Sequence, residues 1–124
     1  MTDKLQAETL LPERSADIEG WLQEMVRRIV ETFDPQRILL FGSHAYGETG
    51  PDSDIDLLVV MESDERPATR SARIASVLSD VPFPMDILVR TPAELHYRLQ
   101  IGDYFIREIL ERGKVLYEQK ISEI

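Results

Sequence analysis

Two aspartates open the stretch of sequence with the most unusual chemistry. Asp54 and Asp56 stand one residue apart, at the start of a run rich in Ile, Leu and Val. In a β-strand, residues two apart project from the same face, roughly 7 Å apart along the strand. Neighbouring carboxylates repel each other, and burying them is costly unless a cation compensates. Mg²⁺ favours carboxylate oxygens and commonly completes its shell with water and phosphate, so this pair is a candidate magnesium site.

A second candidate element precedes the aspartates. An apolar run over residues 38–41 ends in Gly42 and Ser43. A glycine there lets the backbone approach a ligand closely, and a serine can cap a short helix whose free N–H groups point at an anion. Without this context, an Asp-x-Asp sequence is better explained as a solvated turn that runs into an edge strand. With it, an anion cradle adjoins a cation site, as a nucleoside triphosphate with Mg²⁺ requires.

Two other ligand motifs fail on the same residues. Gly42 and Gly47 have the glycine spacing of a P-loop, but Glu48 occupies the lysine position and reverses the charge needed at the phosphates. The alternating aspartates resemble the start of an EF-hand loop. Leu57 replaces the expected glycine, however, and Ser63 replaces the bidentate glutamate. We reject both motifs.

The combined pattern resembles a known signature. Gly42-Ser43, followed after ten residues by Asp54-x-Asp56, is similar to the signature of the DNA polymerase β-like nucleotidyltransferase superfamily. More narrowly, it resembles the minimal nucleotidyltransferases (MNT), which are often partnered with an all-helical HEPN protein in toxin–antitoxin pairs. The resemblance covers about residues 18–118. His44 departs from it, since many members carry arginine there.

The resemblance implies roles for these residues. Gly42 and Ser43 would hold the β- and γ-phosphates of ATP, and Asp54 and Asp56 would hold two Mg²⁺ ions. A pair of such ions can clamp the attacking and leaving oxygens of a phosphoryl displacement.

Two further residues complete the expected site. Asp86 stands inside an apolar strand, where an aspartate needs a reason. The resemblance supplies one, because the third carboxylate of the superfamily comes from a neighbouring strand and can ligate metal and accept a proton from the attacking hydroxyl. Pairing of Asp86 with a nearby arginine is the alternative. Ser53 is assigned to the nucleotide-binding set, and we expect it to fix the start of the second strand by hydrogen bonds.

The implied function is that of an antitoxin enzyme. It would move AMP from ATP to a tyrosine hydroxyl of a partner HEPN toxin. Two alternatives stay open: a small-molecule nucleotidyltransferase similar to aminoglycoside-modifying enzymes, and a non-catalytic antitoxin that masks its toxin by binding.

Length and composition limit the number of domains, the partners and the cellular compartment that we expect. At 124 residues the chain fits one domain, which we place at residues 15–120 after a loose arm over residues 1–14. The net charge of −9 argues against direct DNA or RNA binding. The chain has no cysteine, which fits a reducing cytoplasm, and its longest apolar run is far too short to span a membrane.

The sequence patterns predict the order α-β-(short α)-β-α-β-α-α-β. This is a small α/β (α+β) nucleotidyltransferase fold with a mixed sheet and helices packed mainly on one side. We expect the first helix to start after a Ser15 cap and to end at Asp34-Pro35.

His96, Tyr97 and Tyr104 are candidates for an exposed partner surface. Arg66, just before the helix over residues 68–80, and Arg70 and Arg73 within it are expected on an exposed charged face, with triphosphate contact as the alternative. The residues of this helix expected to face inward are Ala72, Ile74, Ala75 and Leu78. In the helix that follows Asp103, the residues expected to face inward are Phe105, Ile106, Ile109 and Leu110.

Overall fold

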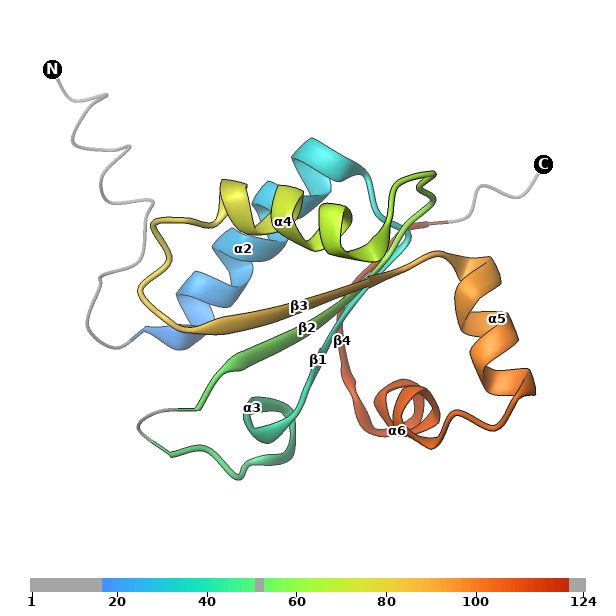
Figure 1. Ribbon diagram of the computed structural model, residues 1–124. Helices are drawn as coiled ribbons and strands as arrows, with labels where there is room; N and C mark the ends of the chain where they lie inside the picture. Colours follow the sequence, from blue (N-terminus) through green and yellow to red (C-terminus); the bar gives the residue numbers. More distant parts are fainter. Residues whose placement is uncertain (1–16, 51–52, 121–124) are drawn as a thin grey trace, which may run out of the picture.

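A four-stranded sheet organises the molecule (Figure 1). The computed structural model describes residues 17–50 and 53–120. The strand order is β3-β2-β1-β4. β1 runs antiparallel to both β2 and β4, whereas β2 and β3 are parallel, so the sheet is mixed as expected. The strands are β1 (Arg37–Phe41), β2 (Ile55–Val60), β3 (Met85–Arg90) and β4 (Lys114–Glu118).

The helices follow the predicted order along the chain. They are α2 (Ile18–Phe33), α3 (Ser43–Tyr46), α4 (Pro67–Val77), α5 (Pro92–Gln100) and α6 (Tyr104–Arg112). The side chain of Asp17 caps α2 by accepting from the Gly20 N–H, and the expected Ser15 cap lies outside the described residues. Asp34 ends α2 in the left-handed conformation, with φ of 49°. The arm expected over residues 1–14 also lies outside the described residues.

Helices cover both faces of the sheet. α2 and α4 pack on the face that carries Ile55, Leu57 and Val59, and this cluster forms the larger core. α5 and α6 pack on the opposite face, against Leu58 and Val60 among others. The two longer helices therefore lie on one face and the two shorter ones on the other, whereas we expected the helices to pack mainly on one side. The reason is that the middle strands are apolar at both sets of alternating positions, so each face has to be shielded from water.

The inward face of α4 differs from the expectation. Ile74 and Leu78 are buried as expected, but Ala72 and Ala75 are exposed. Arg70 takes an inward position with only 5% of its surface exposed, which corrects the expected exposed charged face. Its position follows from helical spacing, because Arg70 lies four and eight residues before the two large apolar side chains.

The inward face of α6 is narrower than expected. Ile106 and Ile109 are buried, and Leu110 packs at the edge of the same cluster. Phe105 remains 53% exposed, so its expected burial is wrong. Its ring instead meets Phe41 edge-on, with 5.8 Å between ring centroids and 82° between ring planes. The core of a nine-residue helix admits one stripe of side chains, and Phe105 lies beside that stripe.

Candidate active site

The sheet register brings the predicted carboxylates together. In the parallel pair of β2 and β3, Asp56 stands directly opposite Asp86. Adjacent strands lie about 4.8 Å apart, and residues opposite each other project from the same face. Asp54 lies one residue before β2 and is exposed, two positions from Asp56. All three aspartates therefore gather at one end of the sheet, although Asp54 and Asp86 are more exposed than Asp56.

Gly42 is held against one of these carboxylates. Phe41 pairs with Asp56 across the antiparallel strands, so Gly42 follows just beyond that pair. A Cβ atom on Gly42 would lie 2.1 Å from Oδ2 of Asp56, far inside van der Waals contact. The φ angle of Gly42 is 73°, in the region that other residues rarely adopt. Glycine is thus required twice here, for its backbone conformation and for the space it leaves to the carboxylate.

The short helix α3 follows at once. Gly42, rather than Ser43, is its N-cap, and no side chain caps it, so the expected serine cap is wrong. Ser43 is instead the first helical residue. The N–H groups of Ala45 and Tyr46 donate to the Gly42 carbonyl. The N–H groups of Ser43 and His44 come before these first helical hydrogen bonds, which is the position that faces an anion at a helix start.

Ser53 fixes the loop that leads into β2. Its hydroxyl accepts a hydrogen bond from the Gly50 N–H at 2.7 Å, and its own N–H donates to the Gly50 carbonyl at 3.2 Å. Nε2 of His44 lies 3.2 Å from the carbonyl oxygen of Ser53. The expected role of Ser53 at the start of this strand matches these bonds. The contact from His44 ties α3 to the residue before Asp54, which gives His44 a structural role that the sequence pattern did not indicate.

The electrostatics of the site favour a cation. Burial raises the pKa of Asp56, and the negative charges of Asp86 and then Asp54 raise it further, while His44 acts in the opposite direction. Within the described residues, no three acidic or histidine side chains converge closely enough to hold a metal ion as they stand. Asp54 and Asp86 are exposed, which leaves space for their side chains to turn toward an ion. The donor set consists of carboxylate oxygens, which suits Mg²⁺.

Two contacts from α6 brace the site, and sequence reasoning missed both. The guanidinium of Arg112 lies over the ring of Tyr46, 4.2 Å from its centroid. Phe105 meets Phe41, the residue before Gly42. Nothing in the local sequence marks these pairs, because each joins residues far apart in the chain.

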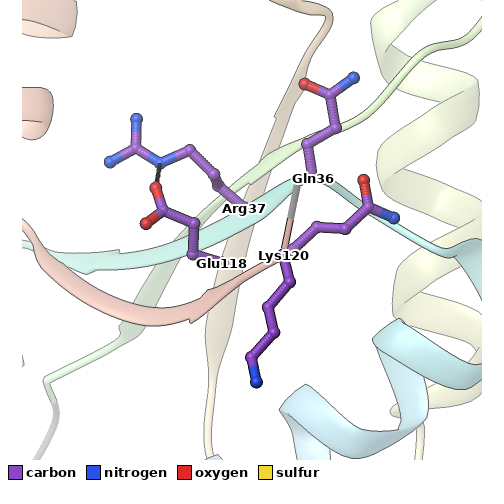
Figure 2. A pocket seen from close by; sticks show the side chains of 5 residues that line it. Gln36, Arg37, Glu118 and Lys120 are labelled. Atoms are coloured by element: carbon purple, nitrogen blue, oxygen red, sulfur yellow. Dashed lines mark ion pairs between the residues drawn. The ribbon is translucent and has the colours of Figure 1, made fainter. Parts of the chain in front are cut away.

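A pocket of about 620 Å³ lies at the opposite end of β1 (Figure 2). It is lined by the start of β1, the end of β4 and the residues beside them, with Nε of Arg37 3.2 Å from a carboxylate oxygen of Glu118. Arg37 pairs with Val60, at the other end of the strand from the pair of Phe41 and Asp56. The pocket is therefore separate from the carboxylates, and Arg37 does not reach them.

Comparison with solved structures places the fold among known proteins. A candidate nucleotidyltransferase from Sulfolobus solfataricus superposes with a TM-score of 0.56 at 18% identity, over 84% of this chain and 83% of that one. A toxin–antitoxin structure with AMP-PNP gives a TM-score of 0.53 at 21% identity, over 83% and 75% of the two chains. The toxin–antitoxin MntA–HepT gives 0.51 at 18% identity, over 82% and 73%. These likenesses show a shared fold.

Sequence comparison gives the family. No curated protein sequence matches this chain. Among the described residues, no helix is both long and apolar enough to cross a bilayer. The family of nucleotidyltransferase domains matches residues 22–116, which hold the glycine-serine turn and all three aspartates. The chain belongs to the nucleotidyltransferase domain family, and it is a nucleotidyltransferase.

Proposed function

We propose that this nucleotidyltransferase moves AMP from ATP to a hydroxyl group with the help of Mg²⁺. The observation that carries the proposal is the register of the sheet, which sets Asp56 beside Asp86 and against the Cα atom of Gly42. A nucleoside triphosphate needs an anion cradle next to a cation site. The start of α3 and the three aspartates supply that combination from adjacent strands.

Each residue has a defined task in this reaction. The backbone of Gly42 and Ser43 holds the β- and γ-phosphates, while Asp54 and Asp56 provide oxygen ligands. Bound Mg²⁺ would neutralise charge on the phosphates as the reaction proceeds. A bond forms between the acceptor oxygen and the α-phosphorus, the bond from that phosphorus to the bridging oxygen breaks, and pyrophosphate leaves. Asp86 accepts the proton of the hydroxyl. Catalysis rests on positioning and charge stabilisation.

The acceptor in this proposal is a tyrosine of a HEPN toxin, and the chain is its antitoxin in the cytoplasm. Two observations support this choice. Two of the three structures compared above are toxin–antitoxin structures, one of them with the ATP analogue AMP-PNP. The described residues form one sheet with its covering helices and no separate recognition domain, so we infer that a second protein supplies the acceptor surface.

The test uses purified chain, Mg²⁺, labelled ATP and the product of the neighbouring gene. We expect label on a tyrosine of that protein with the wild-type chain and none with the double variant Asp54→Ala/Asp56→Ala. Mass spectrometry should show the added mass of AMP. A toxin that both chains neutralise equally, without label, would make this chain a masking antitoxin. Transfer to an aminoglycoside with no protein present would instead favour the small-molecule enzyme.

A further inference from the structure

The exposed hydrophobic side chains of this molecule are concentrated in one place. Among the described residues, five large hydrophobic side chains are exposed. One of them, Val115, lies on β4. The other four fall within nine consecutive residues, at the end of α5, in the turn that follows and at the start of α6. We name them the α5–α6 corner: Tyr97 (58% exposed), Ile101 (54%), Tyr104 (76%) and Phe105 (53%). Concentrated apolar surface of this kind marks interaction sites.

We propose that the α5–α6 corner is the surface on which the acceptor protein docks. This inference rests on the proposed function, because it assigns a surface to the partner of the same reaction. Packing of the fold does not explain these side chains: α5 buries Leu95 and α6 buries Ile106 and Ile109, while the corner stays in solvent.

The corner is rigidly built. The Gly102 N–H donates to the Leu99 carbonyl, and the Asp103 N–H donates to the Arg98 carbonyl at 2.9 Å. The side chain of Asp103 then caps α6 by accepting from the Ile106 N–H at 3.1 Å. A surface held in place before binding loses less conformational freedom on association than a flexible one. The turn thus presents its apolar side chains in a fixed arrangement.

The corner is also continuous with the candidate active site. Phe105 contacts Phe41, which pairs with Asp56 on the neighbouring strand. At the other end of α6, Arg112 lies over Tyr46 beside the phosphate cradle. α6 is nine residues long, which corresponds to about 13 Å. A protein seated on the corner would therefore lie within one helix length of the cradle and could extend a side chain toward the carboxylates.

Charge defines the kind of protein that fits. Residues 90–114 hold five basic and four acidic side chains, a net charge of +1 in a chain of net charge −9. Arg107 on α6 is exposed and makes no ion pair within the described part of the chain. Arg98 reaches Asp103 only at 3.8 Å. The occupant we assign is a folded protein surface with an apolar centre and an acidic rim. Such a surface would be repelled by most of the molecule but not by the corner.

A surface variant tests this assignment. We compare the wild-type chain with Tyr97→Ser/Ile101→Ser/Tyr104→Ser, which leaves the ring contact of Phe105 intact. The matched control is Val115→Thr, which alters the exposed hydrophobic side chain outside the corner. The probe is the product of the neighbouring gene, the same protein as in the test of the proposed function. Calorimetry measures its Kd and the binding of ATP with Mg²⁺, and labelled ATP reports transfer.

We expect the triple variant to bind the protein at least tenfold more weakly, with ATP binding within twofold of wild type, and the control to match wild type. The single variant Tyr104→Ser should weaken protein binding severalfold, and it guards against misfolding because this side chain is the most exposed of the four.

Equal protein affinity of the triple variant and wild type would overturn the inference. So would absence of binding by the wild-type chain while ATP still binds. Light scattering that shows self-association lost in the triple variant would assign the corner to a second copy instead. If the wild-type chain docks through the corner yet transfers no AMP, the docking inference stands and the proposed reaction fails.

Discussion

Carboxylates occur in two contrasting environments in this molecule. On the side of α2 and α4, Glu24 accepts hydrogen bonds from Arg27 and Arg28, and Arg28 also binds Asp80. These hydrogen bonds lower the pKa of Glu24 and of Asp80. At the candidate active site, Asp54, Asp56 and Asp86 make no ion pair within residues 17–50 and 53–120, and the pKa of Asp56 is raised.

This difference shows which carboxylates are neutralised by the basic residues of the chain. There are 14 basic residues against 23 acidic ones, so pairing is selective. Arginines neutralise carboxylates in the scaffold, including Glu94, whose pKa is lowered chiefly by its hydrogen bonds with Arg70. The carboxylates at the start of β2 and β3 receive none within the described residues. Repulsion among these unpaired carboxylates destabilises the folded chain, and a bound cation would remove that destabilisation.

We expect the largest effect on activity from displacing the carboxylate of Asp56, one of the three unpaired aspartates. Gly42→Ala places a methyl group against Oδ2 of Asp56 and strains a φ of 73°. We expect AMP transfer to fall by roughly 100-fold or more, since small misplacements of reacting groups have effects of that size. Gly47→Ala is the control, because it shares a positive φ but has nothing within 4 Å. Initial rates measure both, and a fully active Gly42→Ala would refute the tight approach.

Replacing one carboxylate in each environment by an amide tests the contrast between them through the free energy of unfolding. Glu24→Gln removes the shared partner of Arg27 and Arg28, and we expect a loss of about 2 kcal/mol in unfolding free energy. Asp56→Asn removes one of three repelling charges, so stability should stay equal or rise. Urea denaturation measures both variants. A destabilisation of Asp56→Asn as large as that of Glu24→Gln would mean that the two environments do not differ as described.

The smallest expected effect is the pH dependence of stability. The pKa values of Glu24, Asp80 and Glu94 lie below their ordinary values of 4.5, 3.8 and 4.5. Their stabilisation is complete above those ordinary values and is lost as pH falls through the lowered pKa values of the folded state. Asp56 has the opposite sign, because its raised pKa lets the folded state bind a proton first, which relieves repulsion in acid.

Thermal denaturation between pH 6 and pH 3 should therefore show falling stability, with a steeper fall for Asp56→Asn than for wild type. Parallel curves for the two proteins would contradict the raised pKa of Asp56.

The candidate site could be predicted largely from sequence because its parts are local. Alternation within a strand sets Asp54 and Asp56 on one face, and a glycine between a strand and a turn indicates close approach. The start of α5 is also set locally, since Thr91 and Glu94 form a capping box, whereas the serine cap expected for α3 was wrong. The role of Asp86 was different, since only the resemblance to a known superfamily suggested it. The inward position expected for Ala72 was wrong, because alanine is small enough to be tolerated on either side of a helix.

By itself, the sequence determined the order of helices and strands, the mixed α/β class and the residues proposed to bind phosphate and metal, since short-range periodicity and turn chemistry encode these. Only the tertiary structure decided that Asp86 stands opposite Asp56, because strand register depends on pairing across the sheet. It also decided that Arg70 is buried beside Glu94 and that α6 contacts residues close to the proposed cradle, with Arg112 over Tyr46 and Phe105 against Phe41. Such contacts join residues far apart in the chain, and they form only when the packed faces of helices and sheet meet.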